Sequence, residues 1–208
     1  QVTMINPDDS GIIIIDNNQG TQIIAQNTNG NANYELYVNG SLVDSENDIN
    51  FYNGYQFSNL SENQYCELVI SQGSSSITRT FTILVNNTAT ESLPGNLENG
   101  INYHQSNSSK ATLVIDAPYK DFIYVAGSFN DWTPTSEHAM RKDPNSEKFW
   151  LEVDGLTSGV DYTYQYWVAD LSPLNESPKL VKTADPFSTM VLSPFDDPWI
   201  PENSYPNI

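Results

Sequence analysis

Residues 122–134 read FIYVAGSFNDWTP, and this stretch decides the fold of the region around it. Every position from 122 to 126 is apolar, as in a β-strand that is covered on both faces. Gly127 then permits a bend, and Asn130 supplies turn chemistry just before Trp132. The stretch therefore predicts a buried strand that ends in a turn, with a tryptophan immediately beyond it.

Similar apolar runs recur at short intervals through the first half of the chain, among them GIIII, NYELYV, YCELVIS and ITRTFTILV. Asn39 and Gly40 both tolerate positive φ and predict a hairpin turn after NYELYV. No window of eleven or more residues has a convincing helical period. We therefore expect an all-β protein with two immunoglobulin-like β-sandwiches in tandem and no helix longer than about two turns.

The boundary between the two sandwiches is predicted from a change in pattern. The segment NNTATESLPGN is polar, contains Pro94-Gly95 and lacks an apolar period. In the second half, strands are expected in ATLVIDA, DFIYVAGSF, KFWLEVDGL, DYTYQYWVAD, PKLVKTA and FSTMVL. The expected organisation is a first sandwich over residues 1–88, a linker over 89–96, a second sandwich over 97–194 and a connector over 195–208.

The connector is rich in proline and has no apolar period. We expect order in this tail only where Trp199 or Pro198 packs against a domain.

Composition argues against several classes of function. The net charge is −18 with only eight Lys and Arg residues, so nucleic-acid binding is not expected. No stretch is long enough to span a membrane. The start at Gln1 rather than Met fits a removed signal peptide, and we expect a secreted, periplasmic or outer-surface bacterial protein. Cys66, the one cysteine, shares a strand face with Leu68 and Ile70 and is expected to be buried and inert.

Residues 162–168, YTYQYWV, offer a candidate platform for a ligand. Alternation places the three tyrosines on one face, which we assign to the core, and Gln165 with Trp167 on the other. An amide two residues from an indole suits a sugar, because the ring stacks while the amide binds hydroxyls. The alternative reading is that Trp132 caps the core at the end of the sheet and that the face of Trp167 is buried against another domain. Trp150 is expected in the core.

Four motifs in order carry a family resemblance: LENGINYH at 97–104, GSFNDW at 127–132, YTYQYWVAD at 162–170 and ADPFS at 184–188. Together they resemble the starch- and glycogen-binding module that precedes the catalytic barrel in isoamylases, branching enzymes and related amylases. The same module occurs in the β subunit of AMP-activated kinase. The resemblance covers about half of the chain, whereas the first half matches only a generic immunoglobulin-like module.

The resemblance implies a non-catalytic N-terminal part of an α-amylase-family (family thirteen) glycoside hydrolase. It implies weak binding of α-1,4-glucan through Trp132, with Asn130, Gln165 and Trp167 as further contacts, and a C-terminal catalytic domain as partner. Two features depart from the kinase-type modules: Gln165 stands in place of a basic residue, and residues 171–179 read as an insertion where a second stacking tryptophan is expected. The alternative function is a structural or protein-interaction spacer without sugar affinity.

No catalytic residue is predicted in this chain. Retaining glycosidases need two carboxyl groups about 5 Å apart in a cleft, whereas the acidic residues here fall in turns, such as Asp8-Asp9 and Asp196-Asp197. His104 and His138 are isolated from other ligand types, so we expect no metal site. No nucleotide or dinucleotide motif is present, and we expect no cofactor.

Overall fold

The computed structural model describes residues 1–174 and 177–192. In this part of the chain the expected all-β fold is confirmed, and the only helical elements are two short 3-10 turns, η1 (Ser128–Asn130) and η2 (Ser136–His138). The chain divides into two compact units, Gln1–Asn86 and Asn87–Ile208. Over the same described residues, no helix is long and apolar enough to cross a membrane.

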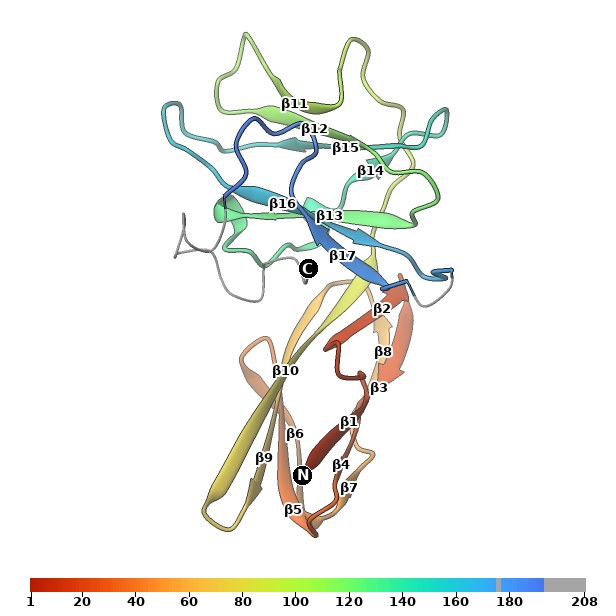
Figure 1. Cartoon of the computed structure of the whole chain (residues 1–208), viewed down its shortest axis with the longest axis vertical. Coiled ribbons are helices and arrows are strands. Elements are labelled where there is room, and N and C mark those ends of the chain that lie inside the picture. The colour runs from red at the N-terminus through yellow and green to blue at the C-terminus, as the bar shows by residue number, and fades with distance from the viewer. Residues whose placement is uncertain (175–176, 193–208) are drawn as a thin grey trace. The chain divides into compact units, whose positions relative to one another are not determined.

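Three sheets build the first unit (Figure 1), with the orders β2-β10-β9-β5-β6, β1-β4-β7 and β3-β8. Paired strands are antiparallel except β2 and β10, which run parallel. The strands are β1 (Val2–Asn6), β2 (Ile12–Asp16), β3 (Gln19–Gln22), β4 (Ile24–Asn27), β5 (Ala32–Val38), β6 (Ser41–Ile49), β7 (Phe51–Tyr52), β8 (Gln56–Leu60), β9 (Gln64–Gln72) and β10 (Ser75–Asn86). The expected hairpin turn lies between β5 and β6, with φ of 50° at Asn39 and 80° at Gly40.

The core of the first unit consists of the inward side chains of these strands. Tyr34 on β5 and Tyr52 on β7 are fully buried, and their rings stack with centroids 5.2 Å apart. Cys66 is buried on β9 with Leu68 and Ile70, as the alternation predicts. Burial raises the pKa of its thiol to about 12, so the thiol stays protonated at neutral pH and acts as a core side chain.

Two sheets build the second unit, and they form two layers in Figure 1, with the orders β11-β12-β15-β14 and β13-β16-β17. All of these pairs are antiparallel. The strands are β11 (Gly100–Tyr103), β12 (Ala111–Asp116), β13 (Phe122–Gly127), β14 (Arg141–Lys142), β15 (Lys148–Val153), β16 (Tyr164–Ala169) and β17 (Leu180–Thr183).

The core of the second unit lies between its two sheets. Leu113 and Phe149 come from one sheet, and Ile123, Val125 and Tyr166 come from the other; none of the five exposes more than 2% of its surface. Every residue of β13 is buried, so the strand is covered on both faces, as its unbroken apolar run predicts.

The segment that follows β10 is hydrogen-bonded to the second unit. The backbone of Lys142 accepts from the amide of Glu91 (3.0 Å) and donates to the carbonyl of Ala89 (2.9 Å). The Glu91 carboxylate pairs with Arg141 at 2.8 Å, and the indole of Trp150 donates to the Glu91 carbonyl at 3.0 Å. Part of the expected linker thus adds to the β14 edge. Backbone pairing with an edge strand needs no apolar period, so the sequence pattern carries no sign of it.

Two strand assignments in the second unit differ from expectation. Residues 187–192, FSTMVL, form no strand, and β16 begins at Tyr164 rather than at Asp161. The segment after β17 instead crosses the first strand of the opposite sheet, where a Cβ on Gly100 would lie 2.8 Å from the Cβ of Phe187. In the first unit, β1 (Val2–Asn6) is an additional strand. The expectations for Trp199 and for the connector over 195–208 lie outside the described residues.

Candidate functional site

The turn after β13 is fixed by the side chain of Asn130. Its Nδ2 donates to the carbonyl of Val125 and its Oδ1 accepts from the amide of Gly127, both at 2.9 Å. A Cβ at Gly127 would lie 2.5 Å from the carbonyl oxygen of Thr163, so glycine is needed for close approach. The backbone there is extended rather than bent, with φ of −169°. Sequence reasoning located the turn but gave Gly127 the wrong physical role.

Trp132 follows this turn in a left-handed backbone conformation. The φ angle is 50° at Asp131 and 58° at Trp132, and the Trp132 amide donates to the Gly127 carbonyl at 3.0 Å. For a bulky side chain this conformation costs about 1–2 kcal/mol, and such strain tends to gather at functional sites. The side chain is half-buried and lines a pocket. The turn therefore holds an indole at the wall of a cavity despite a strained backbone.

The cavity, here called the end pocket, is a hollow of about 840 Å³ in the second unit. Two of its lining residues, Leu113 and Val153, belong to the core between the two sheets. Phe129 and Trp132 line it from the turn after β13, and Tyr103 lines it from β11. Small-molecule sites are typically hollows of about 300–1,000 Å³ with mostly apolar and aromatic walls, and the end pocket fits this description.

One wall of the end pocket is the segment between β15 and β16, residues 156–163, every member of which lines the hollow. The segment is held at both ends, because the Leu156 amide donates to the Ser109 carbonyl (2.9 Å) and the Thr163 amide to Ser128 Oγ (3.2 Å). Inside the segment, the Thr157 amide donates to the Tyr162 hydroxyl at 3.0 Å. This hydrogen bonding lowers the pKa of Tyr162 below its ordinary value. The wall is thus an ordered turn that presents an aromatic ring.

A second wall comes from the segment after β17, which Asp185 anchors. Asp185 is buried, and its Oδ2 accepts from the hydroxyls of Tyr164 (2.7 Å) and Tyr166 (3.2 Å). Its Oδ1 accepts from the amide of Phe187 at 2.8 Å. Burial, followed by contact with Asp185, raises the pKa of Tyr164 well above its usual range. The anchor positions residues 188–192, of which Ser188, Met190, Val191 and Leu192 line the pocket.

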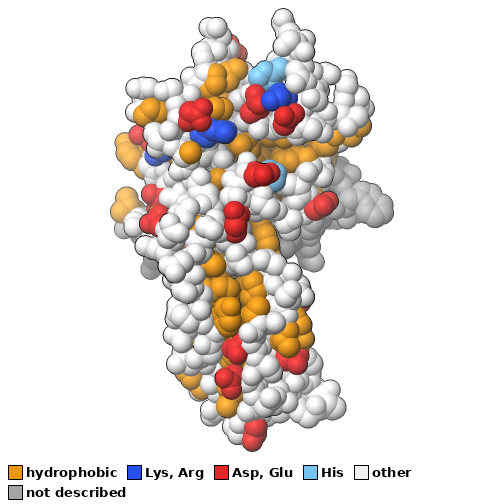
Figure 2. Space-filling model, turned by 180° about the vertical axis from the view of Figure 1, so that it is seen from behind, with side chains coloured by type: hydrophobic (Ala, Val, Ile, Leu, Met, Phe, Trp, Pro, Cys, Tyr) orange, Lys and Arg blue, Asp and Glu red, His pale blue; other side chains and the backbone are white. Residues whose placement is uncertain are grey.

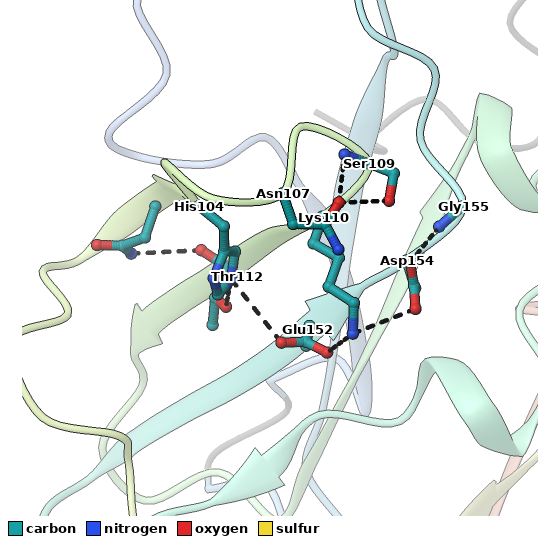
Figure 3. Close-up of polar contacts among 9 residues, drawn as sticks. His104, Asn107, Ser109, Lys110, Thr112, Glu152, Asp154 and Gly155 are labelled. Carbon is teal, nitrogen blue, oxygen red and sulfur yellow. Dashed lines mark hydrogen bonds and ion pairs between the residues drawn. The ribbon is translucent and has the colours of Figure 1, made fainter.

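Figure 3 shows a polar cluster formed by His104, Lys110, Glu152 and Asp154, of which His104 and Lys110 line the end pocket. Lys110 Nζ bridges Glu152 Oε1 at 2.6 Å and Asp154 Oδ2 at 3.2 Å. His104 Nε2 contacts Thr112 Oγ1 at 2.9 Å and lies 3.8 Å from Glu152 Oε2. Hydrogen bonds to Glu152 and Asp154 raise the pKa of Lys110, so its ammonium group stays charged. On the surface of the second unit, charged side chains gather above a band of apolar surface (Figure 2).

The four residues predicted to contact sugar are separated by the structure. Trp132 and Gln165 both line the end pocket. Gln165 exposes only 6% of its surface. Asn130 instead uses its amide to fix the turn backbone. Trp167 is buried, does not line the pocket, and carries Lys182 Nζ 4.3 Å from its ring centroid. The expected platform of Gln165 with Trp167 is therefore corrected.

The correction has a physical reason. Alternation does place Gln165 and Trp167 on the face of β16 opposite the core tyrosine Tyr166. That face is nonetheless covered at Trp167, whose ring carries the ammonium group of Lys182 from the neighbouring strand β17. A strand period gives the side of a sheet but not what packs on that side.

Sequence reasoning missed several residues of the end pocket. Tyr162 was assigned to the core face, but it precedes β16 and belongs to the pocket wall. His104 was treated as isolated, although it meets Glu152 through the pairing of β12 with β15. Trp150 is buried, as expected, with the guanidinium of Arg141 4.9 Å from its ring centroid. The one available signal was the density of aromatic residues around YTYQYWV.

Within residues 1–174 and 177–192, no group of three or more His, Cys, Asp or Glu side chains is arranged to hold a metal ion. The polar cluster does not form such a group because its central member is a lysine. Its chemistry is hydrogen bonding: an ammonium donor, an imidazole and two carboxylate acceptors lie side by side.

No protein-family model matches the sequence, and no curated protein matches it either. Among solved structures, the fibronectin(III)-like modules of Clostridium thermocellum CbhA align with 13% identity and a TM-score of 0.36, covering 89% of this chain and 94% of that one. The Group B Streptococcus pullulanase SAP aligns with 14% identity and a TM-score of 0.34, covering 90% of this chain. A β-glucuronidase of Bacteroides uniformis aligns with 9% identity and a TM-score of 0.31, covering 88% of this chain.

The alignment spans 24% of the pullulanase chain and 24% of the glucuronidase chain. At these TM-scores the similarities say nothing about the function of this chain. A proposal about function therefore depends on the residues of the end pocket.

Proposed function

We propose that the second unit binds an α-1,4-glucan in the end pocket, with Trp132 as the stacking residue and Gln165 as a hydrogen-bonding residue. The observation that carries the proposal is the placement of Trp132: a half-buried indole in a strained left-handed backbone beside a hollow of about 840 Å³. A flat aromatic face suits the C–H face of a glucose ring, and it loses little conformational entropy on binding.

Further lining residues support a sugar rather than a wholly apolar ligand. Tyr103 and Tyr162 add aromatic surface, and Lys110 and Asp161 add a donor and an acceptor for hydroxyl groups. Sugar sites need both, because each hydroxyl loses hydrogen bonds to water when it is bound. Few glucose rings are covered by a pocket of this size, so we expect a dissociation constant of roughly 0.1–1 mM.

At the level of the whole protein, we propose that this chain is a non-catalytic part of an exported α-amylase-type glycoside hydrolase, with the second unit preceding the catalytic domain. The support is the ordered set of motifs LENGINYH, GSFNDW, YTYQYWVAD and ADPFS. In such an enzyme the two sandwiches hold substrate near the active site and support the barrel. The sequence downstream of Ile208 tests this part, since an (α/β)8 barrel there is required.

A structural spacer without sugar affinity is the second candidate, and the surroundings of Trp167 favour it. This indole is 4% exposed and packed under Lys182, so one of the two expected sugar-stacking rings serves packing. In a spacer, Trp132 would also serve only to close the end of the sandwich. The two candidates therefore differ in what Trp132 contacts.

Titration calorimetry with maltoheptaose separates the two candidates. The proposal expects binding heat from the natural protein and its loss in Trp132→Ala, with Trp132→Phe retaining part of the affinity. Tyr119→Ala is the matched control, because Tyr119 is an aromatic residue of the same unit that is 88% exposed and does not line the pocket. Absence of heat from the natural protein at millimolar sugar, or equal binding by Trp132→Ala, would favour the spacer.

A further inference from the structure

The end pocket exposes apolar surface within the part of the chain that the structure describes. Tyr103 and Met190 line the hollow and are each 77% exposed. The large apolar side chains that combine exposure with a place in the pocket lining are Ile101, Tyr103, Val160, Met190 and Val191. Single exposed apolar residues are ordinary on a protein surface, whereas a group of them around one hollow marks a place where something else packs.

Aromatic rings from separate parts of the second unit line this hollow. Tyr103 belongs to β11, Phe129 and Trp132 to the turn after β13, and Tyr162 to the wall of residues 156–163. None of these four side chains is buried. Grooves with aromatic walls bind proline-rich segments, because a polyproline II segment is extended before it binds and therefore loses little conformational entropy.

The chain itself continues from the end pocket with a proline-rich sequence. Leu192, where the described residues end, lines the hollow, and residues 193–208 read SPFDDPWIPENSYPNI. Pro198 and Pro201 are three residues apart, which is one turn of a polyproline II helix, so both rings lie on the same side of such a helix. This is the spacing of proline-rich segments that dock in aromatic-lined grooves.

The connection between Leu192 and Pro198 suits a return of the chain to the pocket. Asp196 and Asp197 precede Pro198, and an aspartate before proline favours a turn. A tether this short keeps residues 198–201 near the pocket at an effective concentration in the millimolar range. Weak packing of two prolines and an indole is therefore enough to fill the hollow.

We propose that residues 198–201, Pro-Trp-Ile-Pro, bind in the end pocket as an intramolecular ligand. The two prolines pack on the rings of Tyr103, Trp132 and Tyr162, and the indole of Trp199 covers Met190. This inference goes beyond glucan binding and does not depend on it. Where both hold, the proline-rich segment and the sugar compete for Trp132, so displacement of the segment opens the pocket.

NMR of the full chain, labelled with carbon-13 in the methionine methyl groups, tests this inference without any sugar. The natural protein should show a nuclear Overhauser effect between the Met190 methyl group and the Trp199 ring. Trp199→Ala should shift the Met190 signal, because it removes the ring current. The signals of Met4 and Met140 should stay in place, because both side chains are buried and neither lines the pocket.

Tyr205→Ala is the matched control, because it removes another aromatic ring of the same segment outside residues 198–201. It should leave the Met190 signal unchanged. Absence of the Overhauser effect together with a Met190 signal that ignores Trp199→Ala overturns the proposal. A Met190 signal that moves with protein concentration also overturns it, since a second copy then covers the pocket. If Trp199→Ala does not fold, as judged by its thermal transition, the Overhauser effect in the natural protein still decides the question.

Discussion

Two tryptophans near the pair of strands β13 and β16 lie in opposite environments. Trp167 lies within β16, opposite Tyr124 of β13, and is buried under Lys182. Trp132 lies in the turn beyond the end of β13, half-buried at the wall of the end pocket. The same residue type thus serves packing in the regular part of the sheet and is available to a ligand where the regular part ends. This agrees with the general placement of binding residues on loops supported by a rigid scaffold.

The largest expected effect is a loss of stability when the packing tryptophan, Trp167, is truncated. Trp167→Ala should destabilise the second unit by about 3–5 kcal/mol, because it leaves a cavity beneath a covered sheet face. Trp132→Ala should cost much less, because its side chain is half-buried. Urea unfolding of both variants measures the difference. Similar losses in the two variants would mean that Trp132 is a packing residue as well.

Trp167→Phe is the matched control for this experiment. The Trp167 indole nitrogen is buried and has no hydrogen-bond partner among the described residues, so phenylalanine removes an unsatisfied donor while it keeps an aromatic ring. We expect Trp167→Phe to lose far less stability than Trp167→Ala. A loss as large as that of alanine would point to a hydrogen bond of the indole in solution.

A second prediction concerns the edge that residues 87–93 add to the second unit. A fragment that begins at Asn87 should unfold at a temperature several degrees higher than one that begins at Leu97. The shorter fragment lacks the backbone bonds to Lys142, the bond from the Trp150 indole and the Arg141 ion pair. Each hydrogen bond contributes about 0.5–1.5 kcal/mol. Equal melting temperatures by circular dichroism would show that this segment does not stabilise the second unit and acts only as a linker.

The smallest expected effect is a pH dependence that arises next to the end pocket. Burial lowers the pKa of His138, whose ring lies 6.0 Å from the ring of the pocket-lining Phe129. A histidine with a depressed folded-state pKa contributes stability above its unfolded value of about 6.5, and this stability is lost as pH falls through the folded-state value. Stability should therefore drop more on acidification in the natural protein than in His138→Gln. Parallel stability curves for the two proteins between neutral and mildly acidic pH would contradict this.

The sequence predicted the fold better than the site, for physical reasons. Strand FIYVA, the hairpin at Asn39-Gly40 and the buried face of Cys66 follow from local patterns of apolar and turn residues. The end pocket does not, because segments that are distant in sequence line it, such as those of Tyr103, Trp132 and Tyr162. The position of Trp132 just beyond the end of a strand could be predicted because its motif is local. The face of Trp167 was predicted correctly, but alternation could not decide whether that face is open, because the residue over its ring, Lys182, lies on a neighbouring strand.

The direct test of the account is the indole N–H signal of Trp132 in a nitrogen-15 NMR spectrum, assigned by comparison with Trp132→Phe and titrated with maltoheptaose. We predict that this signal shifts progressively and saturates at millimolar sugar. The signals of Trp150 and Trp167, both buried outside the end pocket, should stay in place. A stationary Trp132 signal at saturating sugar, or a shift confined to Trp150 or Trp167, would contradict the account.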